Sequence, residues 1–257
     1  MNKVTEHITK WLNGWADKSG LDGFVVGVSG GIDSALASKL CALSGRTSVL
    51  ISMPLHQAPD QLARARAHIE ALCEQHKNCS SVEIDLTEAF DTLHGALKSE
   101  QPSDLALANT RARLRMTTLY AIAQTRRCLV VGTGNRVEDF GVGFFTKYGD
   151  GGVDISPIAD LMKSHVYRLA RHLKVAEAIL DADPTDGLWD DGRTDLDQMQ
   201  VSYAELEWAM QHHGDAADLT EKQRGILSRY NKLRRANLHK MEPVPICKVP
   251  QELLHVE

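Results

Sequence analysis

A short run of small and acidic residues, GVSGGIDS, spans residues 27–34 and holds the first side chains that could carry chemistry. Gly30 and Gly31 let backbone N–H groups approach a phosphate, and a helix beginning here adds partial positive charge. Asp33 supplies a hard carboxylate oxygen, which suits magnesium. A tight strand-to-helix turn capped by Ser34 or Asp33 would use the same residues, and a Gly-Gly turn alone favours that simpler interpretation.

A second unusual stretch, GTGNRVEDFGVGFFTKYGDGGVD, covers residues 132–154 and contains seven glycines. It is too irregular to predict any regular element, and such stretches inside a domain are commonly functional or disordered. Glu138 could bind a metal, Lys163 could neutralise phosphate charge, and the Thr185 hydroxyl could donate to a phosphate oxygen. Taken singly, each also fits a solvated surface residue or an ordinary turn residue.

The surrounding pattern predicts the elements that position these residues. Short β-branched runs alternate with helical periodicity, which predicts a doubly wound, mostly parallel sheet flanked by helices, an α/β fold. We expect strands at 24–28, 48–53, 82–86 and 128–132, and helices at 60–77, 104–126, 160–173, 201–212 and 220–235. Ligands bind such sheets at the carboxyl ends of the strands, where both stretches lie.

Composition narrows the function classes. The chain has 257 residues and a formal net charge of -5, which fits one domain over 1–257 and argues against a mainly electrostatic nucleic-acid partner. No apolar run approaches a membrane span, and the N-terminus lacks a signal-peptide pattern. The five scattered cysteines include no CxxC pair. We therefore expect a cytoplasmic protein without disulfides.

Two family resemblances favour the functional interpretation. The string SGGIDS resembles the PP-loop of ATP pyrophosphatases, whose fold is adenine nucleotide alpha hydrolase-like. The segment 132–164, with LRM at 114–116, PTDGLW at 184–189 and HK at 239–240, resembles ammonia-dependent NAD synthetases. The resemblance implies a ligase that uses ATP and Mg²⁺ to amidate the nicotinate carboxylate of deamido-NAD with ammonia. The reaction passes through an acyl-adenylate and gives NAD, AMP and pyrophosphate.

The same resemblance assigns roles to individual residues. Asp33, Lys163 and Thr185 are the expected catalytic residues, and Asp33 and Glu138 the expected magnesium ligands. Residues expected to contact ATP are Gly27, Val28, Ser29, Gly30, Gly31, Ile32, Asp33, Ser34, Thr133, Lys163 and Thr185. Residues expected to hold the dinucleotide are Arg113, Lys147, Asp154, His239 and Lys240. Asp150 receives no role.

Some features depart from the family pattern. One extra residue separates Glu138 from TKYGDGG, and Arg193 and Leu196 replace Gln and Glu in a segment that could close over the site. Amidation of nicotinate mononucleotide, and a non-catalytic nucleotide-binding regulator, therefore remain alternatives. A tRNA-modifying PP-loop enzyme is disfavoured by the acidic charge. The length leaves no room for a glutaminase domain, so we expect free ammonia as donor, with a separate glutaminase possible, and by resemblance a homodimer.

Overall fold

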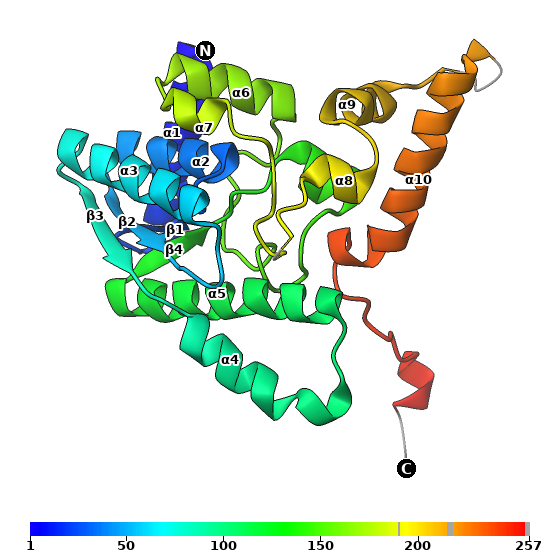
Figure 1. The fold of residues 1–257 in the computed structure, drawn as a ribbon, viewed down its shortest axis with the longest axis horizontal. Coiled ribbons are helices and arrows are strands. Elements are labelled where there is room, and N and C mark those ends of the chain that lie inside the picture. The colour runs from blue at the N-terminus through cyan, green and yellow to red at the C-terminus, as the bar shows by residue number, and fades with distance from the viewer. Residues whose placement is uncertain (190, 215–217, 255–257) are drawn as a thin grey trace.

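A parallel β-sheet lies between layers of helices in the computed structural model, which describes residues 1–189, 191–214 and 218–254 (Figure 1). Within these residues the sheet has the strand order β3-β2-β1-β4. Its strands are β1 (Gly23–Gly27), β2 (Thr47–Ser52), β3 (Cys79–Glu83) and β4 (Cys128–Val131). All pairings are parallel, so the carboxyl ends of the strands share one edge.

The third strand begins three residues earlier than predicted. β3 is an edge strand whose side chains are half-buried or exposed, so its sequence carries little apolar character. The more apolar residues Ile84 and Leu86 follow the strand, and their N–H groups donate to backbone oxygens of Ser52 and Pro54. The hydrophobic run therefore marks the end of the strand and not its centre.

Helices cover both faces of the sheet, which confirms the doubly wound architecture. One face packs against α1 (Asn2–Ser19), α2 (Ile32–Leu43), α3 (Pro59–Gln75), α6 (Lys163–His172) and α7 (Glu177–Leu180). The other packs against α4 (Thr87–Ala96) and α5 (Asp104–Arg126). Alternation along β1 sends Phe24 and Val26 to the first core and Val25 to the second. All three side chains are fully buried.

The glycine-rich stretch contains one regular element, so the prediction that it holds none was wrong. Val137–Val142 forms a short π-helical turn, η2. Val137 and Val142 are buried and anchor this turn to a small core of its own. Gly143 then ends it with a φ of 67°, a conformation that glycine adopts without strain.

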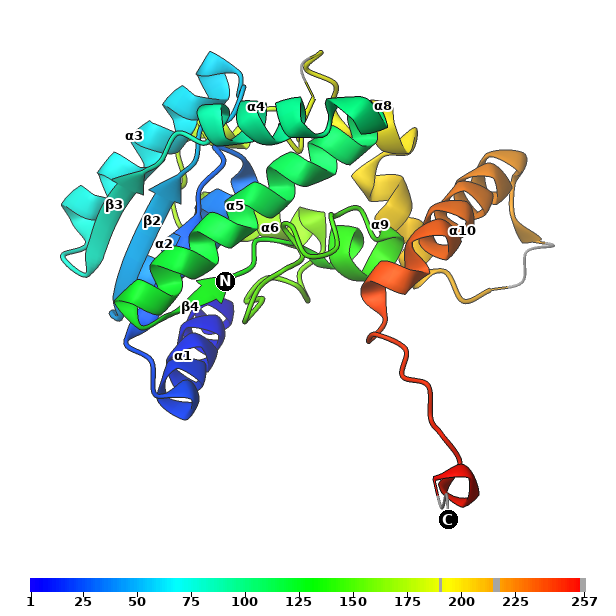
Figure 2. The same cartoon turned by 90° about the horizontal axis from the view of Figure 1, so that it is seen from below.

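The C-terminal part of the described chain is helical. It comprises α8 (Asp195–Met199), α9 (Tyr203–Gln211) and α10 (Glu221–Met241), after which the chain extends away from the sheet to a short 3₁₀ turn at Gln251–Leu253 (Figure 2). The helices predicted at 201–212 and 220–235 are thus present, whereas the short helix α8 was not foreseen. Among the helices of the described residues, none combines the length and apolarity needed to cross a membrane.

Candidate active site

A cavity of about 240 Å³ lies where the strands end, between the segment after β1 and the glycine-rich stretch. Residues 27–34, all predicted to contact ATP, line it. Segments 131–134 and 182–188 form further walls and bring Thr133 and Thr185 to the same cavity. The Thr185 hydroxyl donates to the backbone oxygen of Arg193 and accepts from the N–H of Gly187, so it is held in a turn.

The loop after β1 is held in a defined conformation by a glycine and by hydrogen bonds of Ser34. Gly30 has a φ of 90°, and a Cβ atom there would lie 2.3 Å from the backbone oxygen of Gln61. Ser34 Oγ accepts from the N–H of Ser29 at 3.1 Å and donates to the oxygen of Gly31 at 3.0 Å. The loop is thereby fixed at the N-terminus of α2, where backbone N–H groups attract anions.

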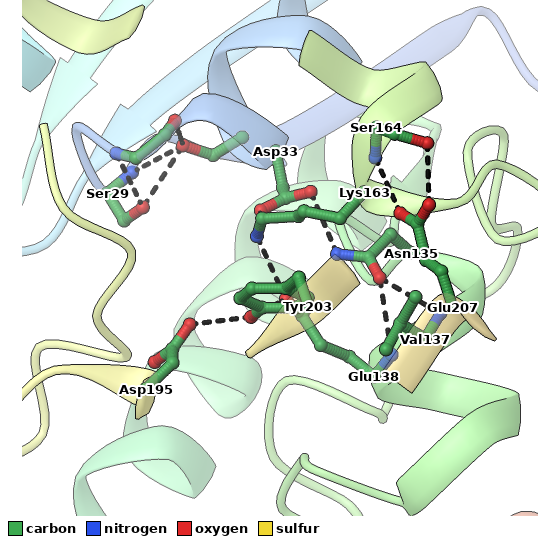
Figure 3. Close-up of polar contacts among 12 residues, drawn as sticks. Ser29, Asp33, Asn135, Val137, Glu138, Lys163, Ser164, Asp195, Tyr203 and Glu207 are labelled. Carbon is green, nitrogen blue, oxygen red and sulfur yellow. Dashed lines mark hydrogen bonds and ion pairs between the residues drawn. The ribbon is translucent and has the colours of Figure 1, made fainter. Parts of the chain in front are cut away.

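The structure brings together three side chains that lie up to 130 positions apart (Figure 3). Lys163 Nζ donates to Asp33 Oδ2 at 2.6 Å and to Glu138 Oε1 at 2.9 Å. Lys163 is 4 % exposed, which excludes the interpretation that it is an ordinary surface lysine. One buried ammonium therefore contacts both carboxylates predicted to bind the metal and offsets part of their negative charge.

Burial and charge shift the pKa values of Asp33 and Lys163. Desolvation raises the pKa of Asp33, although Lys163 acts in the opposite direction. Burial alone would lower the pKa of Lys163, but the carboxylates of Asp33 and Glu138 raise it above its ordinary value. Lys163 is therefore a permanent cation at neutral pH. Perturbed groups of this kind in a cavity are typical of catalytic sites.

Three residues of this network were not predicted as site residues. Asn135, fully buried, donates to Asp33 Oδ1 at 3.1 Å, and its side-chain oxygen accepts from the N–H groups of Val137 and Glu138. Tyr203 and Asp195 extend the network from α9 and α8 (Figure 3). For Asn135, its position inside the GTGN string was the one signal in the sequence. Tyr203 resembles an ordinary core aromatic residue, and Asp195 resembles a residue in the first turn of a helix, so neither gave a signal.

The five residues predicted to hold the dinucleotide do not line this cavity. Four of them, Arg113, Lys147, His239 and Lys240, lie near one another at the end of α10, and the side chains of three of them donate to backbone oxygens there. Arg113 donates to the oxygen of Lys147, Lys147 to that of His239, and Lys240 to those of Gly143 and Phe145. They form a separate basic group on α5, the glycine-rich stretch and α10.

Asp154, the fifth, lies elsewhere and secures the glycine-rich stretch to the sheet. Its Oδ2 accepts from the N–H of Val130 at 2.8 Å, and its Oδ1 accepts from the Tyr120 hydroxyl at 3.1 Å. Asp154→Ala removes both acceptors, so we expect the free energy of unfolding to fall by about 1–2 kcal/mol. Urea denaturation measures this. Tyr120→Phe, which keeps the bond to Val130, should lose less; an unchanged unfolding free energy in Asp154→Ala would contradict the anchoring role.

The segment with Arg193 and Leu196 is held by contacts of its own. Arg193 forms an ion pair with Asp191 and lies 4.1 Å from the ring centroid of Trp189. Leu196 is exposed. Neither lines the cavity, whereas Asp150 does, and burial raises its pKa to about 6. Residue 190 of the same segment lies outside the described residues.

Asp33 and Glu138 suit a magnesium ion chemically. Both are carboxylates whose oxygens converge on one cation, Lys163 Nζ. Hard oxygen donors match Mg²⁺, which commonly takes only one or two protein carboxylates and completes its shell with phosphate and water oxygens. Within the described residues no group of three or more His, Cys, Asp or Glu side chains could hold a metal alone, in keeping with that pattern.

The sequence and the fold were compared with those of known proteins. The NAD synthase family profile matches residues 4–244. The NH(3)-dependent NAD(+) synthetase of Carboxydothermus hydrogenoformans is 37% identical over 221 residues, covering 84% of this chain and 88% of the relative. That of Archaeoglobus fulgidus is 37% identical over 254 residues, covering 96% and 97%. The structure of NMN synthetase from Francisella tularensis has a TM-score of 0.84 at 32% identity, covering 97% of this chain and 98% of the other. A match across this much of the chain, around a PP-loop cavity with its charged trio, places the protein in the NAD synthase family.

Proposed function

We propose that the protein joins ATP to the nicotinate carboxylate of deamido-NAD and lets ammonia displace AMP, giving NAD, AMP and pyrophosphate. The observation that carries the proposal is the trio formed by the buried Lys163 and the partly buried Asp33 and Glu138, beside the loop after β1. Relatives described as NH(3)-dependent NAD(+) synthetases support the same reaction, in which the carboxylate, a poor electrophile, must first be activated.

The chain's own residues divide the work between binding and charge balance. Backbone N–H groups of residues 29–34 hold the β- and γ-phosphates, which leave together as pyrophosphate. The Lys163 ammonium stabilises the negative charge that develops at the α-phosphate, and the Thr185 hydroxyl donates to a phosphate oxygen. These groups are fixed before substrate binds, so little reorganisation accompanies the reaction.

Asp33 and Glu138 would hold Mg²⁺, which when bound would neutralise phosphate charge as a Lewis acid. Asn135 fixes the position of Asp33 relative to the start of η2, because it donates to Asp33 and accepts from two backbone N–H groups of η2. The acceptor would reach the cavity past the basic group of Arg113, Lys147 and Lys240, whose positive charge suits a pyrophosphate. In a homodimer, which we include in the proposal, a second subunit could cover this group; light scattering that gives a single-chain mass of 28.4 kDa would refute the dimer.

The choice of acceptor is the part most open to experiment, because the Francisella tularensis structure is that of an NMN synthetase. Pyrophosphate release from the purified protein with ATP, Mg²⁺ and ammonium should be compared for deamido-NAD, nicotinate mononucleotide and no acceptor. We expect release that depends on deamido-NAD, with kcat/KM at least tenfold above that for the mononucleotide. The reverse preference would keep the proposed chemistry but overturn the proposed substrate. If neither acceptor supports pyrophosphate release, both the chemistry and the substrate are overturned.

A further inference from the structure

Asp195 has a buried carboxylate oxygen without a hydrogen-bond partner. The residue is 5 % exposed and lines the cavity. Its Oδ2 accepts from the Tyr203 hydroxyl at 2.6 Å, whereas Oδ1 has no partner within the described part of the chain. Leaving a buried carboxylate oxygen unsatisfied costs free energy, so Oδ1 is prepared for a ligand that donates hydrogen bonds.

Two connections hold Asp195 at the phosphate end of the cavity. Its backbone N–H donates to the oxygen of Pro184 at 3.0 Å, which ties α8 to the turn that carries Thr185. Its side chain reaches Glu138 through Tyr203, because the same hydroxyl also contacts Glu138 Oε1 (Figure 3). The residue that carries the unpartnered oxygen is thus fixed in the wall of the cavity that Asp33, Glu138 and Lys163 also line.

The charges around Asp195 favour a cation. A tyrosine hydroxyl has one proton and can donate to only one of two carboxylates at a time. Glu138 is already paired with Lys163 Nζ, whereas Asp195 makes no ion pair among the described residues. Burial first and the charge of Glu138 second raise the pKa of Asp195 to about 7, which reflects how poorly its negative charge is balanced.

A cation that donates hydrogen bonds would satisfy the unpartnered oxygen and also offset the unbalanced charge of Asp195. Ammonium has these properties, and the proposed reaction requires it as the source of the amide nitrogen. We propose that Asp195 Oδ1, oriented by the Tyr203 hydroxyl, binds the ammonium ion in the active-site cavity. The assignment rests on the proposed function and adds to it the residue that recognises the nitrogen donor. A sugar hydroxyl of a nucleotide substrate is the competing donor that the experiment must exclude.

Asp195→Asn tests the assignment because it keeps an acceptor for Tyr203 but removes the charge. A charge-assisted hydrogen bond is lost, so we expect the KM for ammonium to rise about ten- to a hundredfold. Turnover at saturating ammonium, and the KM values for ATP and deamido-NAD, should stay within about twofold of wild type. Asp195→Glu keeps the charge and should have a lower ammonium KM than Asp195→Asn. Asp181→Asn, which removes an exposed carboxylate at the end of α7, should behave as wild type.

The outcomes separate this assignment from the proposed function. Exchange of labelled pyrophosphate into ATP, with deamido-NAD and without ammonium, reports adenylation alone; its absence in the wild type would refute the proposed function. If exchange is normal and the ammonium KM of Asp195→Asn is unchanged, the ammonium site is refuted. A rise in the KM for ATP or deamido-NAD instead would show that Asp195 binds a sugar hydroxyl. Thermal melting identifies any variant that fails to fold. If Asp195→Asn fails, Asp195→Glu is compared with wild type instead, and an ammonium KM that the longer side chain leaves unchanged would also refute the site.

Discussion

Replacing Lys163 with methionine should lower turnover by about a hundred- to a thousandfold, the effect of losing a fixed group that stabilises transition-state charge. Lys163 Nζ is the cation that contacts both Asp33 and Glu138, and it lines the cavity beside the loop after β1. Steady-state pyrophosphate release measures the loss. Lys10→Met, which removes an exposed lysine on α1, should leave turnover unchanged.

The same variant should also be less stable, by up to about 3 kcal/mol, because two largely buried carboxylates lose the cation that they share. Lys163 lowers the pKa of Asp33, so its removal moves that pKa further above the ordinary value. A raised carboxylate pKa means that stability is retained at low pH and lost as pH rises through it. Lys163→Met should therefore regain part of its thermal stability relative to wild type as the pH falls and Asp33 is protonated; a stability deficit that does not change with pH would contradict the charge-balance role.

Asp33→Ala should reduce turnover by about a hundred- to a thousandfold without unfolding the protein. Loss of a metal-binding carboxylate removes several kcal/mol of transition-state stabilisation. The fold should persist because Lys163 keeps its ion pair with Glu138 and the buried face of α2 is untouched. Pyrophosphate release and thermal melting give the two quantities.

Asp160→Asn is the matched control for Asp33→Ala. Asp160 is a nearby carboxylate whose side chain is 97 % exposed and whose partner, Arg136, is also partly exposed. An exposed pair of this kind contributes little to stability, so turnover and melting should match wild type. Wild-type turnover in Asp33→Ala would show that Asp33 is not a metal ligand.

The loop between β1 and α2 could be predicted because its information is local. Residues 24–34 encode a buried strand, a glycine turn and a helix start in one continuous stretch, and the structure has β1, the loop and α2 there. The helix at 104–126 was predicted to the residue, because this stretch contains neither Gly nor Pro. In the structure Ser103 caps it by accepting from the N–H of Ala106.

The charged trio could not be predicted from spacing. Asp33 and Lys163 are 130 positions apart, and each taken alone resembles a helix cap or a surface lysine. Only the resemblance to a family joined them, and it did not point to Tyr203 or Asp195, whose contacts depend on how α8 and α9 pack against η2. Long-range packing of this kind leaves no periodicity in the sequence. The π-helical turn was missed for a related reason, because its stability comes from the burial of Val137 and Val142.

The central claim is that this cavity adenylates a carboxylate, and the fate of a carboxylate oxygen tests it most directly. Deamido-NAD labelled with ¹⁸O in both nicotinate carboxylate oxygens should be converted with ATP, Mg²⁺ and ammonium, and the products analysed by mass spectrometry. If the carboxylate attacks the α-phosphorus and ammonia then breaks the bond between the acyl carbon and the bridging oxygen, each AMP carries one ¹⁸O and the amide retains the other. Label in inorganic phosphate or pyrophosphate, or AMP without label, would contradict the acyl-adenylate and with it the proposed use of the site.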